Sequence, residues 1–160
     1  DVVNGGLAND YVQGGLGNDL LIGEAGNDKL RGNEGDDIMY GGAGDDLLYG
    51  EIGHDIVNGG AGHDKLYGGG TTGSLFLFDT DTLGFTDKVF DFYFAKGDVL
   101  DFSQIAAGDP TFALKFGTGI YTDILQVVSE GQTYSLIQFL RTDILNKSVQ
   151  ELIDSGHFVV

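Results

Sequence analysis

The chain has 160 residues, a formal net charge of −17 and an isoelectric point near 4.1. This acidity argues against nucleic-acid binding, which needs a basic surface for the phosphates, and favours cations as ligands. The absence of cysteine excludes disulfides and thiolate metal sites, and no apolar run reaches the length of about 18 residues that suggests a membrane-spanning helix.

An aspartate recurs at every ninth position through the first half of the chain: Asp1, Asp10, Asp19, Asp28, Asp37, Asp46, Asp55 and Asp64. An aliphatic residue or methionine follows two places after each of them: Val3, Val12, Leu21, Leu30, Met39, Leu48, Val57 and Leu66. A glycine frame precedes the aspartates, most clearly in residues 14–19 and 41–46. Three residue classes kept in phase over eight periods predict a structural repeat that binds metal.

Each nine-residue unit is expected to divide into a six-residue turn and a three-residue strand, such as residues 47–49. Because side chains alternate along a strand, the middle residue alone points inward, which explains why that phase is uniformly apolar. Two units make one coil of about 18 residues, so we predict an all-β fold with a right-handed parallel β-roll over residues 1–75. Ala8, Glu24 and Glu51 replace glycines of the turns and are expected to be local weak points, whereas Asn33 is tolerable there.

The repeat is expected to need an ion to fold. One inward aliphatic residue per unit offsets little of the entropy lost by nine ordered residues, and stacked carboxylates repel one another. A divalent ion between stacked turns reverses the repulsion, so the ion-free repeat should be largely unfolded. Hard carboxylate and carbonyl oxygens favour Ca²⁺ over Mg²⁺ and Zn²⁺. His54 and His63 occupy a polar, exposed phase and are not expected to be ligands.

The pattern resembles the glycine- and aspartate-rich nonapeptide of the RTX proteins, and the match covers residues 5–67 in seven consecutive units. The resemblance implies calcium ions that each lie between two turns one coil apart, held by two carbonyls and one aspartate from each turn.

Five complete sites follow from the resemblance. The first joins Gly6, Ala8 and Asp10 to Gly23, Ala25 and Asp28, and the second joins Gly15, Gly17 and Asp19 to Gly32, Glu34 and Asp37. The third joins Glu24, Gly26 and Asp28 to Gly41, Ala43 and Asp46, and the fourth joins Asn33, Gly35 and Asp37 to Gly50, Ile52 and Asp55. The fifth joins Gly42, Gly44 and Asp46 to Gly59, Ala61 and Asp64.

The ends of the repeat are less complete. Asp1 can complete a further site with Gly14, Leu16 and Asp19, which brings the expectation to five or six ions. A site that continues from Asp55 lacks its second carboxylate, because Gly73 stands at that phase.

The second half differs in composition, since all 11 phenylalanines lie at or beyond Phe76 and 21 of the 28 glycines lie at or before Gly73. We therefore predict a domain boundary between residues 75 and 76, with Leu75 on the aliphatic phase of the last rung. Residues 76–160 are expected to form a β-rich C-terminal cap with strands over residues 111–116, 123–128 and 133–140. A short terminal helix is predicted from the capping box of Ser148 and Glu151, with Gly156 as its stop.

Residues 89–92 and 97–103 resemble the segment that follows RTX repeats in type I secretion substrates, above all in large bacterial RTX adhesins. The C-terminal end is expected to cover the sheet edge of the last rung and to act as a secretion signal read by an ABC exporter. Asp91, Asp98 and Asp101 could hold an extra calcium ion, or Asp98 and Asp101 could shape a turn that enters a strand, and the turn is favoured.

The sequence predicts a calcium-binding, monomeric RTX region of an exported bacterial protein, secreted or on the cell surface, without membrane insertion. The chain opens at Asp1 inside a repeat and without an export signal, so we expect the C-terminal piece of a longer protein. No nucleophile-elbow pattern is present, and the repeat explains the carboxylate pairs as ligands, so no enzyme activity is expected.

Two alternatives remain. One is a carbohydrate-binding module that resembles the RTX modules of alginate epimerases, with Arg31, Tyr49 and Tyr67 on one face and Tyr40 and Asn58 on the other. The other is the non-catalytic tail of a secreted protease or lipase.

Overall fold

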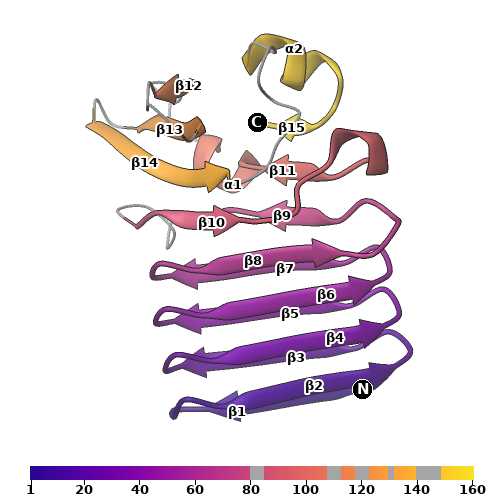
Figure 1. Ribbon diagram of the computed structural model, residues 1–160. Helices are drawn as coiled ribbons and strands as arrows, with labels where there is room; N and C mark the ends of the chain where they lie inside the picture. The colour runs from indigo at the N-terminus through magenta and orange to yellow at the C-terminus, as the bar shows by residue number, and fades with distance from the viewer. Residues whose placement is uncertain (80–84, 108–112, 118–122, 130–131, 140–148) are drawn as a thin grey trace.

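The computed structural model describes residues 1–79, 85–107, 113–117, 123–129, 132–139 and 149–160. The first half is a solenoid whose coils stack one on another from the N-terminus upward (Figure 1). Its strands are β1 (Val2–Gly6), β2 (Tyr11–Leu16), β3 (Leu20–Ala25), β4 (Lys29–Glu34), β5 (Ile38–Ala43), β6 (Leu47–Ile52), β7 (Ile56–Ala61) and β8 (Lys65–Gly69). The odd-numbered strands form one parallel sheet and the even-numbered strands form the other.

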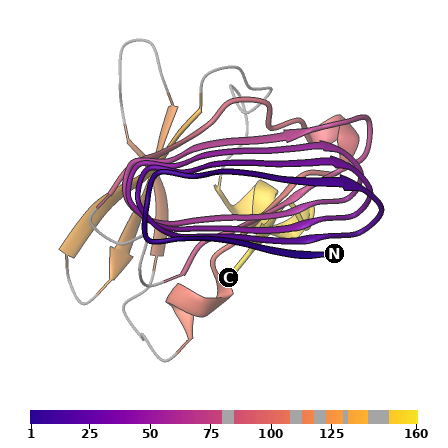
Figure 2. The same cartoon turned by 90° about the horizontal axis from the view of Figure 1, so that it is seen from below.

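The coil length agrees with the prediction of two nine-residue units. Val12 pairs with Leu30 and Leu21 pairs with Met39, so residues 18 positions apart lie above one another. Seen along the axis in Figure 2, the coils superpose as a flattened ring. The predicted parallel β-roll is confirmed.

The inward phase of the repeat forms the core of the roll. Its buried members are Val12, Leu21, Leu30, Met39, Leu48, Val57 and Leu66. Val3, in the first strand, is partly buried because neighbours cover it from one side of the coil. The alternation of side chains along a strand thus decides which residues are buried, as the sequence predicts.

The strands are longer than predicted. Most run for six residues rather than three, since the backbone continues to pair with the next coil beyond the first glycine of the turn. Glu24 still pairs with Gly42, and Asn33 with Glu51. The expected length was wrong because glycines have no side chain whose alternation could show that the strand continues.

The phase of the repeat shifts by one residue at β9 (Leu75–Leu77). Leu75 pairs with Ile56 and Phe76 pairs with Val57, so Phe76 occupies the inward position that Leu75 was expected to hold. Ser74, not Gly73, consequently stands at the aspartate phase. Both expectations were wrong because the turn before β9 holds one residue more than the earlier turns, which counting by nines does not detect.

Both sheets of the roll continue into the second half. β10 (Asp87–Val89) pairs in parallel with β8, and β11 (Val99–Asp101) pairs in parallel with β9. A 3₁₀ turn, η2 (Phe94–Lys96), and a short helix, α1 (Ser103–Ala106), flank β11. The sheets therefore cross the predicted boundary between residues 75 and 76, and a division into two folding units there stays a prediction.

The cap extends the two sheets in different ways. An antiparallel meander of β12 (Ala113–Gly117), β13 (Asp123–Ser129) and β14 (Gln132–Phe139) joins the even-strand sheet through β10. These strands correspond to the three that the sequence predicts, although residues 111 and 140 lie outside the described residues. The short strand β15 (Phe158–Val159) pairs with β11 and covers the edge of the odd-strand sheet.

The terminal helix α2 (Val149–Asp154) ends where the sequence predicts. Gly156 has a φ of 77°, and its N–H donates to the carbonyl of Ile153 at 2.9 Å. The N–H of His157 donates to the carbonyl of Leu152 at 3.0 Å, which completes the hydrogen-bond pattern of a Schellman C-cap. Ser148 lies outside the described residues, so the capping box stays a prediction.

Phenylalanines replace the aliphatic residues of the core toward the cap. The fully buried ones are Phe76, Phe78, Phe92, Phe102 and Phe158. Phe78 and Phe102 stack with ring centroids 5.2 Å apart, and Phe102 meets Phe158 edge to face at 6.0 Å. The larger side chains fill a core that the regular repeat no longer shapes. No helix among the described residues is long and apolar enough to cross a membrane.

Candidate metal centre

The repeat aspartates form two columns, one on each side of the roll. The odd-strand column precedes strands of the odd-strand sheet and comprises Asp1, Asp19, Asp37 and Asp55. The even-strand column precedes strands of the other sheet and comprises Asp10, Asp28, Asp46 and Asp64. Within each column, Oδ1 of an upper aspartate accepts the backbone N–H of the aspartate one coil below, at distances between 2.7 and 3.1 Å. This bond orients the carboxylates of Asp28, Asp37, Asp46, Asp55 and Asp64.

The second oxygen of these carboxylates is buried and has no partner. Oδ2 accepts no hydrogen bond in Asp10, Asp19, Asp28, Asp37, Asp46, Asp55 and Asp64. Asp37 and Asp64 are fully buried as residues. An unpaired buried carboxylate oxygen costs considerable free energy, so a column of them points to a cation that the fold is built to hold.

Backbone carbonyls of the next coil lie beside these oxygens. A Cβ atom at Gly14 would lie 2.5 Å from Asp19 Oδ2 and 2.8 Å from the carbonyl oxygen of Gly32, which places both atoms around one cradle. Gly5 has the same relation to Asp10 Oδ2 and the Gly23 carbonyl, at 3.0 and 3.2 Å. Equivalent pairs recur at Gly23, Gly32 and Gly41. In all five cases the two oxygens belong to one of the five predicted sites.

Other predicted carbonyl ligands have a partner already. The carbonyls of Glu34, Ala43, Ile52 and Ala61 each accept one backbone N–H across coils, at 2.7 to 2.9 Å. A carbonyl oxygen has two lone pairs, so one remains for an ion. The assignment of individual carbonyls to an ion stays a prediction, as does the site with Asp1. There, Asp19 Oδ1 accepts the terminal ammonium of Asp1 at 2.6 Å.

Burial changes the acidity of the central carboxyls. It raises the pKa of Asp46 to about 7, with a contribution from the charges of Asp64 and Asp28. Burial likewise raises the pKa values of Asp55 and Asp64 to about 6. The donated N–H from the coil below opposes each shift. Without a cation, the fold therefore disfavours the charged form that a metal ligand requires.

The donor set suits a hard cation. No group of three or more His, Cys, Asp or Glu side chains that could hold a metal occurs in the described part of the chain, so each site would depend on two carboxylates together with carbonyls. Oxygen donors of this kind fit Ca²⁺, which accepts six to eight of them in flexible geometry, better than they fit zinc. The residues present fit calcium.

A second ladder of side chains, which the sequence reading missed, runs beside the aspartates. Asn9 accepts the N–H of Asn27, and Asn27 accepts that of Asp45, at 2.8 and 3.1 Å. Asn18 and Asp36 do the same in the other column, at 3.0 and 2.9 Å. His54 and His63 end these ladders, and their Nδ1 atoms lie 3.0 and 3.2 Å from the carbonyl oxygens of Gly73 and Thr86. The recurrence of Asn or Asp just before each repeat aspartate was the available signal.

Asp91, Asp98 and Asp101 accept hydrogen bonds from backbone N–H groups, as the turn interpretation expects for Asp98 and Asp101. Asp98 accepts the N–H of Ser74 and of Tyr93, at 2.8 and 2.6 Å. Asp91 accepts from Gly68 and Gly69, and Asp101 accepts from Ser103.

The repeat also matches a known family. Residues 1–30, 13–48, 22–57 and 40–72 match the family model of the RTX calcium-binding nonapeptide repeat, in four copies. Residues 1–72 are RTX calcium-binding repeats. The RTX β-roll is a structural, non-catalytic type of domain, and the family assignment supports calcium as the ion.

A comparison with curated proteins finds none that matches. Among solved structures, the chain is similar to the solution structure of the AlgE6R3 subunit of the Azotobacter vinelandii mannuronan C5-epimerase, with a TM-score of 0.53 and 19% identity. The match covers 97% of this chain and 80% of that one. At this identity the likeness concerns the fold of the RTX roll and its cap.

Proposed function

We propose that this chain is the calcium-folded C-terminal region of an exported bacterial protein, with an adhesin as the expected parent. The proposal depends chiefly on the two columns of buried Oδ2 atoms without a hydrogen-bond partner. Each column stacks carboxylates at every coil, so calcium and folding are coupled by mass action. Where calcium is far below millimolar, the repeat stays extended and can pass through an exporter. Outside the cell, calcium folds it and opposes its return.

The cap supports a role in this process. β15 pairs with β11 and Leu152 of α2 is buried in the common core, so the last residues fold onto the roll. An exporter would read this end while the chain is unfolded, and the same residues would then close the sheet edge.

Export of a fused passenger tests the proposal. The full chain and a version that ends at Lys147 are expressed with a type I ABC exporter, and the passenger is measured in the medium. We expect export of the full chain and at least a tenfold loss for the truncated version. Equal export of both would reduce α2 and β15 to a cap. No export of either, beside an exporter control that works, would contradict the secretion proposal.

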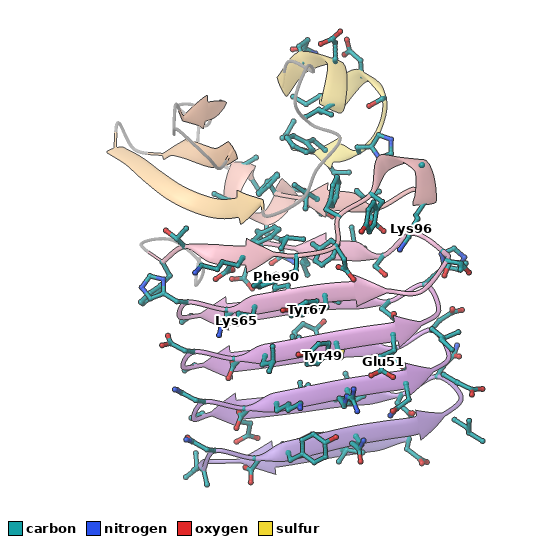
Figure 3. The ribbon with its side chains drawn as sticks, in the orientation of Figure 1. Tyr49, Glu51, Lys65, Tyr67, Phe90 and Lys96 are labelled. Atoms are coloured by element: carbon teal, nitrogen blue, oxygen red, sulfur yellow. The ribbon has the colours of Figure 1, made fainter. Side chains whose placement is uncertain are left out.

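A second candidate function is the binding of an acidic polysaccharide, and the outer face of the even-strand sheet favours it. Tyr49, Tyr67 and Phe90 lie one above another on this face (Figure 3). Tyr67 stacks on Tyr49 with centroids 4.6 Å apart and on Phe90 at 4.5 Å. Arg31 lies over the Tyr49 ring at 5.5 Å. Lys29, Lys65 and Lys88 each stand next to an inward-facing residue of β4, β8 or β10, so their side chains lie on the outer face. Together with Arg31, they place four of the eight Lys and Arg residues of the chain on this face.

Short mannuronate oligomers test this alternative by calorimetry with the calcium-loaded chain. If this face binds the glycan, Tyr67→Ala should weaken binding about fivefold, given the usual ~1 kcal/mol of one ring or cation contact. Tyr40→Ala serves as the control, because Tyr40 is 39% exposed on the opposite sheet. Equal binding by both variants, or no binding by the wild type, would remove this candidate.

A further inference from the structure

The even-strand column of aspartates continues past the repeat. Asp87 is the first residue of β10, and Val89 pairs with Leu66, so Asp87 stands one coil above Asp64 although the two are 23 residues apart. The backbone N–H of Asp64 donates to Asp87 Oδ1 at 3.0 Å. This is the bond that joins neighbouring aspartates lower in the column, where the separation is 18 residues. The chain thus rebuilds the aspartate position after an insertion of five residues.

Asp87 has the same unsatisfied oxygen as the repeat aspartates. It is 0% exposed, and its Oδ2 has no hydrogen-bond partner. Oδ2 of Asp64, directly below, is also buried and unpartnered. Neither carboxyl forms an ion pair, since the ion pairs among the described residues are Asp1 with Asp19 and Arg31 with Glu51. Two adjacent buried carboxyls without a cation repel each other and lack hydration.

The odd-strand column ends differently. Ser74 replaces the aspartate above Asp55, and Asp98 stands above Ser74. Both oxygens of Asp98 accept backbone N–H groups, from Ser74 and Tyr93. Asp98 therefore needs no cation, whereas Asp87 has one oxygen that the protein leaves without a partner. Asp87 and Asp98 thus differ in whether backbone N–H groups satisfy both of their carboxylate oxygens.

We propose that Asp64 and Asp87 hold a further calcium ion, outside the nonapeptide repeat, at the junction between the roll and its cap. The inference rests on the proposed calcium binding of the roll. Paired carboxylates are hard oxygen donors of the kind that Ca²⁺ prefers. β10 pairs with β8 of the roll on one side and with β14 of the cap on the other. An ion next to Asp87 would thus make the attachment of the meander depend on calcium, in addition to the fold of the repeats.

The number of bound ions tests the proposal. Calcium per chain is counted by native mass spectrometry for the wild type, Asp87→Asn and Asp101→Asn, each at saturating calcium. Asparagine at residue 87 keeps an oxygen for the N–H of Asp64 but removes the negative charge. Asp101 is the matched control, because it also lies beyond the repeat and accepts a backbone N–H, from Ser103 at 2.8 Å.

We expect Asp87→Asn to bind one ion fewer than the wild type and Asp101→Asn to bind the same number. An unchanged count for Asp87→Asn would overturn this inference and leave the proposed function intact. A wild type that binds no calcium would overturn both. The variant should keep the calcium-induced circular dichroism of the roll, because the repeat sites below Asp64 are unaltered.

Should Asp87→Asn fail to fold, a crystal structure of the wild-type chain grown with calcium decides the matter. An ion between Oδ2 of Asp64 and Oδ2 of Asp87 supports the proposal. Two carboxyl groups with no ion between them would overturn it.

Discussion

Glu24 and Glu51 hold a backbone conformation that favours glycine. Their φ angle is 77°, in the left-handed region, and Asn33 at the same phase has a φ of 78°. Glycine holds this phase in other coils, for instance Gly42 with a φ of 111°. The prediction that the two glutamates are strained positions is supported. Ala8, which the sequence also marks as a weak point, is not among the left-handed residues of the described chain, so no backbone strain is expected there.

Replacing Glu24 by glycine should therefore stabilise the calcium-loaded roll. A residue with a Cβ pays about 1–2 kcal/mol in the left-handed region, and glycine returns part of this through a more flexible unfolded chain. We expect a net gain of about 1 kcal/mol in the free energy of unfolding, measured by urea denaturation at saturating calcium. Ala8→Gly is the control and should be neutral or destabilising. A larger gain from Ala8→Gly than from Glu24→Gly would refute this reading of the strain.

At the scale of elements, the aspartates act as shared ligands rather than as isolated ones. By the RTX pattern, Asp46 belongs to the third and the fifth sites, whereas Asp10 belongs to the first alone. Asp46→Asn should therefore lose about two calcium ions and Asp10→Asn about one, since each site depends on two carboxylates. Counting ions by equilibrium dialysis distinguishes the two variants. Equal losses would contradict the shared arrangement within the even-strand column.

The sequence predicts the elements of the roll well, because a single residue phase controls burial. Leu48 and Leu66 are buried as expected, and the pairing by two units follows from the repeat. The shift at Ser74 and the return of the column at Asp87 could not be predicted, since both depend on insertions inside turns. Such insertions leave the coils stacked but change the 18-residue spacing in the sequence from which the stacking is predicted. The hydrogen bonds of Asn9 and Asn27 were also missed, because their phase mixes residue types and reads as a polar surface.

At the scale of the whole molecule, the raised carboxyl pKa values link folding to pH. The pKa of Asp46 is raised to about 7 and those of Asp55 and Asp64 to about 6, chiefly by burial. In the unfolded chain these groups titrate near 3.9. Folding without calcium therefore takes up protons between about pH 4 and 7. The free energy of unfolding of the calcium-free roll consequently rises as the pH falls through this window.

The calcium-free chain should consequently gain β-structure when the pH is lowered from 8 to 5 in the presence of a chelator. The calcium concentration at the folding midpoint should rise over the same range, because protons compete with the ion for the carboxylates. Circular dichroism at several pH values checks both trends. The pH is kept above the isoelectric point near 4.1, where the chain would precipitate. Stability that falls on acidification without calcium would contradict the assigned sign.

The most direct test of the account is a calcium titration of the chain at pH 7.5, followed by far-ultraviolet circular dichroism. The columns of unpartnered Oδ2 atoms predict a largely unfolded spectrum in chelator and a cooperative gain of β-structure on adding calcium. Magnesium at the same concentration should produce far less, since it holds its waters. A chain that shows its full β-spectrum in chelator, and does not respond to calcium, would contradict the account.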